Sequence, residues 1–394
     1  MTEDRSPLAE RFSIVGGGPI PRLLAVLGRA ADEHPRLVRR TLIAVLVTWL
    51  PMLVLSALRG TAYGPRVTIP FVRDFAVNVR FLVAVPILIL AESGIAKTWR
   101  TIALHFLRSG LVTEKGLPSF EAAIERTMRL RDRILPEVLL AITAFSPLIF
   151  YRSEPLLGGV STWHTDGTGS GALSPAGWWF ALVSTPFFRF LLLRWFWRLS
   201  LWTLFLWRTS RTGLHLVASH TDLAAGLGIL SEGQKAFSPI VFAGGAVVAA
   251  SVGNSIAYQG ATLASMKVPM IAYGVLAVVL LIAPLLVVAP VLLDVKKKAL
   301  FEYGALVTLH DQLFETRWLR GEKAGEQVIL GSNDASSLND LGAGYTVVRQ
   351  MTFIPINRQT LITLALAAAL PMGVLALFVT PAEQLLRMVM KMLG

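Results

Sequence analysis

Stretches of almost uninterrupted apolar residues alternate along the chain with polar connectors. Each stretch has about the length that a helix needs, at 1.5 Å per residue, to cross roughly 30 Å of hydrocarbon. The sequence therefore predicts an all-α fold, a polytopic transmembrane helical bundle of about seven spans, with six or eight as alternatives. Prolines inside or beside the spans predict kinks. The predicted spans cover residues 41–58, 75–93, 136–151, 178–194, 237–258, 268–293 and 361–380.

Basic residues gather in some connectors and are absent from another. The N-terminal segment 1–40 and connectors 94–135, 208–236 and 295–357 together carry most of the Lys and Arg residues, whereas residues 153–177 carry none. Because cytoplasmic connectors are enriched in Lys and Arg, we expect the basic segments in the cytoplasm and residues 153–177 outside. The expected protein is a multi-pass membrane protein, with segment 1–40 preceding a transmembrane domain, 41–394. We expect no cleavable signal peptide.

The connectors suggest further local structure. Charged helical region 94–135 should break near residues 110–118 and then run without interruption into the third span. Trp and Arg residues alternate after Arg194, which predicts that the fourth span ends there and an interfacial helix follows. Connector 295–357 should begin as a helix and continue as the flexible stretch GSNDASSLNDLGAG. The tail PAEQLLRMVMKMLG has apolar residues at helical spacing and predicts a second interfacial helix.

Composition narrows the class of protein. With 54% hydrophobic residues, 16% charged residues and a mean hydropathy of +0.60, the chain has too much apolar surface for a soluble domain. The net charge of +12 resides mainly in connectors, so we expect no nucleic-acid partner. The chain has no Cys, which excludes disulfides, thiolate metal sites and cysteine nucleophiles. We expect no cofactor.

The span at 237–258 has a stripe of small residues. Gly245, Ala249, Gly253 and Ala257 recur every fourth residue and share one helix face. Such a face lets two membrane helices approach closely. We therefore predict that this helix is the central, tightly packed span. Near its far end, Ser251, Asn254, Ser255 and Tyr258 are polar groups that lipid cannot satisfy, so they need protein, water or a ligand.

Arginines lie at membrane depth, where carboxylates are missing. Arg189 falls about 16 Å below the start of its span, near the midplane, and Arg80 roughly 9 Å below the start of another. The acidic residues Glu92, Glu137 and Asp294 all fall at the expected cytoplasmic ends. This pattern favours an anionic ligand over a cation, with Arg194 as a further pathway candidate, and a structural Arg paired with carbonyls is the alternative.

A metal site on the cytoplasmic side is a weaker hypothesis. His220 with Asp222, and His310 with Asp311 and Glu315, could be brought together from two connectors. The spacing matches no standard ligand motif. The alternative is that these side chains are solvated and that His220 and Asp222 cap the next helix.

The segment HTDLAAGLG, His220–Gly228, followed by SPIVFAGG, resembles a broadly distributed group of bacterial multi-pass inner-membrane proteins of uncharacterised function. The group's pattern is His-Pro-Asp-x-x-Gly-Gly-Leu-Gly, from which this chain departs at Thr221 and Ala225. The resemblance covers about a tenth of the chain. It implies a polytopic inner-membrane protein and no particular activity.

Three functions fit these observations. The first is a channel or transporter, with a small anion as the expected ligand and the lipid bilayer as the environment. The second is a non-transporting sensor or scaffold whose cytoplasmic connectors bind a partner, and a homo-oligomer would suit either function. The third is a membrane enzyme acting on a lipid-linked substrate with the His and acidic residues of the cytoplasmic side. No residue is assigned a catalytic role, and a hydrolytic triad in the outer loop is disfavoured because no nucleophile motif is present.

Overall fold

The computed structural model describes residues 7–17, 33–149, 161–166, 172–320 and 333–379. Every regular element in these ranges is a helix, which confirms the predicted all-α fold. Six helices are long and apolar enough to cross a membrane. A polytopic membrane protein is the class that such helices define. The six helices are Leu37–Leu58, Phe75–Arg108, Pro175–Thr209, Leu230–Gln259, Lys267–Leu319 and Arg358–Val379.

The first half of the chain forms two hairpins and a polar helix between them. The short helix α1 precedes the first hairpin. The elements are α1 (Pro7–Glu10), α3 (Glu33–Thr48), α4 (Leu50–Leu58), η1 (Phe71–Arg73), α5 (Phe75–Val79), η2 (Arg80–Ala84), α6 (Val85–Arg108), α7 (Leu117–Arg131), α8 (Ile134–Ile149), α9 (Pro175–Trp179), η3 (Phe180–Ser184) and α10 (Thr185–Thr209).

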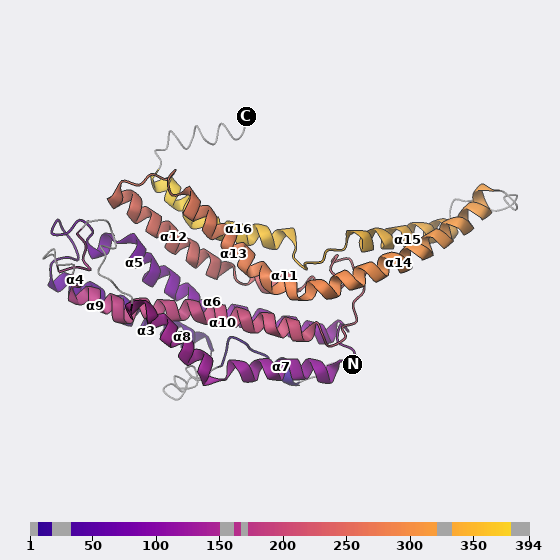
Figure 1. Ribbon diagram of the computed structural model, residues 1–394, viewed down its shortest axis with the longest axis horizontal. Coiled ribbons are helices and arrows are strands. Elements are labelled where there is room, and N and C mark those ends of the chain that lie inside the picture. The colour runs from indigo at the N-terminus through magenta and orange to yellow at the C-terminus, as the bar shows by residue number, and fades with distance from the viewer. Residues whose placement is uncertain (1–6, 18–32, 150–160, 167–171, 321–332, 380–394) are drawn as a thin grey trace.

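The second half adds three long helices and a projecting hairpin. Its elements are α11 (Leu230–Lys235), α12 (Ser238–Gln259), α13 (Lys267–Ile282), η4 (Ala283–Val288), α14 (Ala289–Phe314), η5 (Glu315–Leu319), α15 (Asn333–Gln350) and α16 (Arg358–Val379). Figure 1 shows α12, α13 and α16 lying together, with α6 and α10 beside them and α7 further out. Helix α12 packs against α16, α13, α5 and α6 and is central, as predicted.

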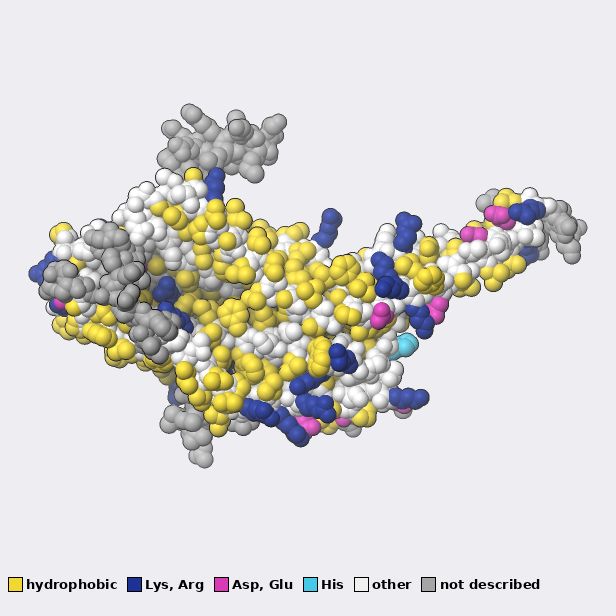
Figure 2. Space-filling view, viewed as in Figure 1, with side chains coloured by type: hydrophobic (Ala, Val, Ile, Leu, Met, Phe, Trp, Pro, Cys, Tyr) yellow, Lys and Arg dark blue, Asp and Glu magenta, His cyan; other side chains and the backbone are white. Residues whose placement is uncertain are grey.

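Helices α14 and α15 pack antiparallel and extend well beyond the bundle (Figure 1). We call this hairpin the arm, and the end of the bundle from which it projects the arm end. The opposite end, where α5 and α9 begin, is the far end. The arm is fixed at its base, where Tyr303 Oη donates to Ser219 Oγ at 3.1 Å and Lys296 Nζ donates to the carbonyl of Met351 at 2.7 Å. An apolar band covers the bundle between these ends, and basic side chains gather mainly near the arm end (Figure 2).

Aromatic packing holds the arm end of the bundle together. The indoles of Trp99 on α6 and Trp202 on α10 stack in parallel, with ring centroids 4.8 Å apart. Two phenylalanines complete the cluster. The ring centroid of Phe237, just before α12, lies 5.5 Å from that of Trp99, and the ring centroid of Phe205 on α10 lies 5.5 Å from that of Trp202. Because large aromatic side chains bury the most apolar area per residue, this cluster fixes α6, α10 and α12 against one another.

The structure corrects three local predictions. Helix α10 continues through Arg194 to Thr209, so no separate interfacial helix follows the fourth span. Helix α7 ends at Arg131 and α8 begins at Ile134, so these helices are not continuous. The stretch expected to be flexible is helical from Asn333, because it packs along α14. The third predicted span coincides with α8, whose described apolar part is Ile134–Ser146, and the end of that span, after Ile149, lies outside the described residues. The tail after Val379 lies outside the described residues.

Two of the long helices share a local design that hydropathy does not reveal. Asp74 caps α5 by accepting from the Val77 N–H, and Ser174 caps α9 by accepting from the Gly177 N–H. Each five-residue helix continues into a five-residue π-helical turn, η2 or η3. A long helix with Pro at its second position, Pro86 in α6 or Pro186 in α10, follows. Corresponding residues are 100 positions apart. Single π-helical turns occur frequently at functional sites.

Candidate functional site

Arg80 begins the π-helical turn η2, inside the helix Phe75–Arg108 that is long enough to span a membrane. Its guanidinium carbon lies 5.5 Å from the ring centroid of Phe188 on α10. Its Nε is buried and has no hydrogen-bond partner among the described residues. A buried N–H donor without a hydrogen-bond partner is costly, because its desolvation is not offset.

Arg189 follows Phe188 on α10 and is half-buried. It lies close enough to Arg80 for the two positive charges to repel each other. Within the described ranges neither side chain forms an ion pair, so the two cations, which we call the arginine pair, face a shared need for negative charge.

The nearest described carboxylate, Asp74, is occupied by other donors. Its Oδ1 accepts from the Val77 N–H at 3.1 Å and from Asn254 Nδ2 at 2.8 Å. Its Oδ2 accepts from Trp163 Nε1 at 3.0 Å. Asn254 Oδ1 in turn accepts from the Phe75 N–H at 3.0 Å. Asp74 therefore ties α5, α12 and the loop before α9 together. Its charge attracts Arg80 more strongly than Arg189 repels it, but no hydrogen bond or ion pair joins Asp74 to either arginine.

The other polar candidates on α12 are satisfied by protein. Tyr258 Oη donates to the carbonyl of Arg73 at 3.0 Å. Ser251 Oγ donates to the carbonyl of Val247 at 2.8 Å, and Ser255 Oγ to that of Ser251 at 3.3 Å. With Asn254 bonded to Asp74, all four side chains have partners. The far end of α12 is thus held in place by polar contacts and brings no free donor toward the arginine pair.

His164 is a site residue that sequence reasoning missed. Its ring stacks on Trp163 with centroids 3.8 Å apart and meets Phe180 edge-on at 4.8 Å. Burial lowers the pKa of His164 to about 4, the charge of Asp74 opposes this shift and that of Arg80 adds to it. The imidazole is therefore neutral near pH 7. Asp74 and Trp163 are 89 positions apart, so nothing local in the sequence could have indicated their contact.

Arg194 has a different environment from the arginine pair. It belongs to a buried ionic cluster in which Glu92 Oε1 lies 2.8 Å from Arg198 Nη2 and 3.9 Å from Arg194 Nη1. Arg40 Nη1 contacts Glu92 Oε2 at 3.3 Å, and Arg194 Nε lies 3.9 Å from Glu137 Oε1. The cluster joins α3, α6, α8 and α10. Because Arg194 is engaged with two carboxylates, it is poorly suited to bind a permeating ligand.

The small-residue stripe lies against neighbouring helices over most of its length. A Cβ added to Gly245 would come within 2.8 Å of the Ala368 carbonyl oxygen on α16. A Cβ on Gly253 would come within 3.2 Å of Leu375 Cδ1. Ala249 is buried, whereas Ala257 is exposed. The close backbone approach that the stripe predicts is therefore made by α12 and α16 at Gly245.

The segment His220–Gly228 folds around the carboxylate of Asp222. This carboxylate accepts from the backbone N–H groups of Ala224, Gly226 and Gly228 at 2.9, 3.1 and 2.8 Å. Burial alone would raise the pKa of Asp222, but these bonds and the contact with His220 outweigh burial and lower it. The loop also reaches the arm, because the Thr352 N–H donates to the Leu223 carbonyl at 2.7 Å. Asp222 therefore organises the loop rather than capping the next helix, α11, which has no side-chain cap.

The residues suggested for a metal site lie in separate places. His220 and Asp222 contact each other at 2.9 Å and line a cavity of about 270 Å³ with His105 and His215. His310 lies on the arm, where its Nε2 contacts Ser337 Oγ at 2.9 Å, and Asp311 and Glu315 follow on the same hairpin. Over the described part of the chain, no three His, Asp or Glu side chains are grouped to hold one metal ion.

Fold and site together define a polytopic α-helical membrane protein. Arg40, Arg194 and Arg198 form ion pairs in a buried cluster, whereas Arg80 and Arg189 form no ion pair with a described residue. Comparison with protein families, with curated proteins and with solved structures gives no match.

Proposed function

We propose that the protein carries a small anion across the membrane and that Arg80 and Arg189 bind this anion. The observation that supports the proposal is the arginine pair itself. Two guanidinium groups lie in helices long enough to span a membrane, repel each other, and form no ion pair with a described residue. An anion between them would offset both the desolvation and the repulsion.

The surroundings of the pair support the same function. Phe81 of η2 meets Phe180 of η3 and Phe188 of α10 edge-on, each at 6.4 Å between centroids. The two helices with π-helical turns therefore pack together next to Arg80. Transporters often bind their substrate where two structural repeats meet near the midplane. Movement of one such helix against the other would alter the access to the arginine pair.

The direction of the chain in the membrane follows from charge. The arm end carries the basic connectors, and cytoplasmic segments are enriched in Lys and Arg. The proposal therefore assigns the arm end and the N-terminal segment to the cytoplasm of a bacterial cell, and the arginine pair to the half of the inner membrane nearer the far end.

Flux measurements test the role of the pair. Protein in liposomes would be assayed with chloride, nitrate and small organic anions, with thermal melting of each variant measured in parallel. We expect that Arg80→Gln and Arg189→Gln each abolish flux while the protein remains folded. The matched control is Arg129→Gln, which removes an exposed arginine paired with Glu125 on α7 and should leave flux unchanged.

Three results would reject the proposal. A wild-type protein that moves none of these anions would favour a non-transporting function. Variants that melt early before flux is lost would assign the pair a structural role. Flux that survives both substitutions would place the pathway elsewhere.

The exposed apolar face of the arm favours a second candidate function, a scaffold. Leu306, Leu309 and Leu313 recur at helical spacing along α14 with more than half of each side chain exposed, and Phe301, on another face of the helix, is 82% exposed. A face of this kind outside the membrane favours contact with another protein, here a second copy of the chain. If the arm joins two copies, Leu309→Asp should convert a dimer into a monomer in light-scattering measurements, and a wild-type monomer would exclude this function.

A further inference from the structure

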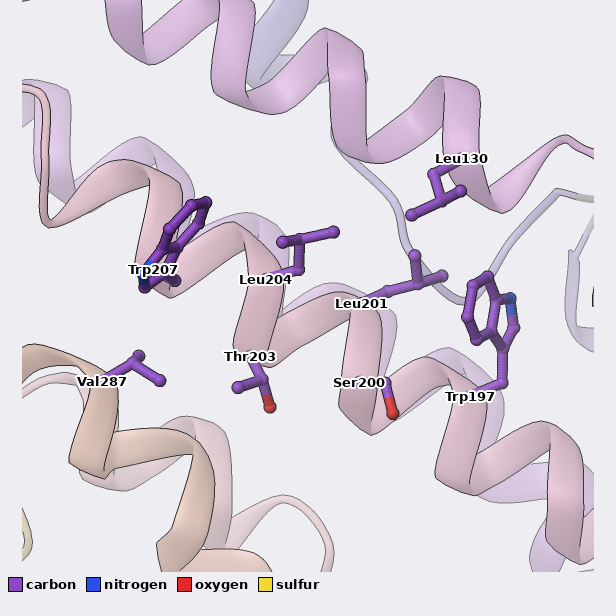
Figure 3. Close-up of a pocket in the computed structure, with 8 residues that line it drawn as sticks. All are labelled: Leu130, Trp197, Ser200, Leu201, Thr203, Leu204, Trp207 and Val287. Atoms are coloured by element: carbon purple, nitrogen blue, oxygen red, sulfur yellow. The ribbon is translucent and has the colours of Figure 1, made fainter.

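A groove of about 550 Å³ runs along α10 between the end of α7 and η4. Figure 3 shows its length along α10, from Trp197 beside Leu130 to Trp207 beside Val287. Ten residues of helix separate the two tryptophans, which corresponds to about 15 Å. The volume falls within the range of about 300–1,000 Å³ typical of sites for small molecules.

The groove offers a ligand almost no polar group. Its two hydroxyls are turned back onto their own helix, because Ser200 Oγ donates to the Phe196 carbonyl at 3.0 Å and Thr203 Oγ1 donates to the Leu199 carbonyl at 2.8 Å. The remaining lining side chains are Leu, Val and Trp. A polar or hydrated ligand would therefore gain nothing in the groove, whereas an aliphatic chain would gain from leaving water.

Positive charge is concentrated at the Trp207 end. The guanidinium carbon of Arg211 lies 4.2 Å from the ring centroid of Trp207. Arg208 Nη1 donates to Thr127 Oγ1 at 3.1 Å. The guanidinium groups of Arg208 and Arg126 are close enough for their positive charges to repel each other. In the ranges that the structure describes, none of these three arginines forms an ion pair. The end of the groove thus favours an anionic group with several oxygens.

The other end of the groove opens toward lipid. Leu130 lies just before α8, whose side chains Ile134, Leu135, Leu139 and Ile142 are more than half exposed and form an apolar surface that suits acyl chains. Three charged residues, Arg131, Asp132 and Arg133, lie between Leu130 and this surface, so the acyl chain of a lipid would meet the groove beside a polar turn.

We propose that the groove binds an anionic phospholipid, with an acyl chain along Trp197–Trp207 and the phosphate at Arg208 and Arg211. Long apolar lining and basic residues at one end match the two parts of such a lipid. The site differs from the arginine pair, since its residues lie in the arm-end half of α10 and no anion needs to pass through it. Its occupant would fasten α7 to α10 and η4.

Lipid titrations on the purified full-length chain test this proposal. Melting temperature would be measured in detergent with increasing phosphatidylglycerol, and separately with phosphatidylcholine and with inorganic phosphate. For the wild type we expect a saturable rise with phosphatidylglycerol, a much smaller rise with phosphatidylcholine and none with phosphate. The double variant Arg208→Gln/Arg211→Gln removes two charges and should weaken the apparent affinity for phosphatidylglycerol roughly 30-fold.

Two further variants separate lipid binding from folding defects. Ser200→Phe fills the groove and should reduce the response to both lipids, while Arg129→Gln on α7 should respond like the wild type. Equal responses to phosphatidylglycerol and phosphatidylcholine, an unchanged response in the double variant, or a similar rise with phosphate alone would each overturn the proposal. Loss of lipid binding with anion flux intact would leave the proposed transport function standing, and the reverse result would leave the lipid site standing.

Discussion

Glu92 is the residue whose replacement should damage the fold most directly. It is 7% exposed and contacts three arginines from two neighbouring helices, Arg40 on α3 and Arg194 and Arg198 on α10. Glu92→Gln keeps the shape of the side chain but removes its charge. The three guanidinium groups would then share a single carboxylate, Glu137, which lies near Arg194.

The expected loss follows from burial. Breaking a buried ion pair by neutralising one partner costs roughly 3–5 kcal/mol, because the remaining charge stays desolvated. Glu125 provides a matched control, since its contact with Arg129 at 2.6 Å is shorter than any in the cluster but is exposed. Exposed pairs at this spacing contribute only about 0.3–0.5 kcal/mol. Burial, rather than distance, should therefore decide the difference between the two substitutions.

Equilibrium unfolding by dodecyl sulfate in mixed micelles, followed by near-ultraviolet circular dichroism, would measure both variants. Glu92→Gln should unfold at a clearly lower detergent fraction than the wild type, and Glu125→Gln at the same fraction. The double variant Glu92→Gln/Arg198→Gln should recover part of the loss, because it removes one of the unpaired charges. If Glu92→Gln unfolded together with the wild type, the cluster would not be desolvated and our account of Arg194 as a structural residue would fail.

Three further predictions concern single contacts. Gly245→Ala should lower the melting temperature, since the added Cβ meets a backbone carbonyl at 2.8 Å, whereas Gly274→Ala, with nothing within 4 Å, should raise stability by about 0.5–1 kcal/mol through helix propensity. Burial lowers the pKa of His164 to about 4, so on acidification the unfolded chain binds a proton at this residue before the folded chain does. The free energy of unfolding should therefore fall by at most about 3 kcal/mol as pH decreases from about 6.5 to about 4. This fall should disappear in His164→Gln. Ala225 has a φ of 54°, so Ala225→Gly should stabilise the loop by about 1 kcal/mol in thermal melts while Ala224→Gly should not.

Much of the architecture could be predicted from local patterns. Apolar length and Lys/Arg distribution are properties of each segment alone, so the membrane class and the centres of most spans followed from them. The ends of helices were predicted less well. Helix α10 continues past Arg194 because Glu92 and Glu137, from two other helices, neutralise arginines that would otherwise seek the headgroups. Helix α15 forms because α14 lies beside it.

The candidate site shows the same limit. Hydropathy identified Arg80 and Arg189 as unusual, because each interrupts an apolar segment. It could not show that they approach each other, or that Asp74 is occupied by Trp163 and Asn254. Such contacts join residues far apart in the sequence, and the π-helical turn at Arg80 depends on packing that no local pattern encodes.

The two sets of arginines on α6 and α10 differ in their counter-ions. Arg80 and Glu92 lie on the same continuous helix, and Arg189 and Arg194 lie on another, so each helix contributes one residue to the arginine pair and one to the ionic cluster. In the cluster, carboxylates within 3.9 Å satisfy the arginines, and a ligand would have to displace them. Arg80 and Arg189 form no ion pair with a described carboxylate, so a ligand that binds the arginine pair displaces none. On the proposed function, a small anion would therefore bind there without breaking an ion pair between described residues. The cluster joins α6 and α10 about three helical turns from Arg80 and about one and a half to two and a half turns from Arg189, so we expect that binding would affect both helices.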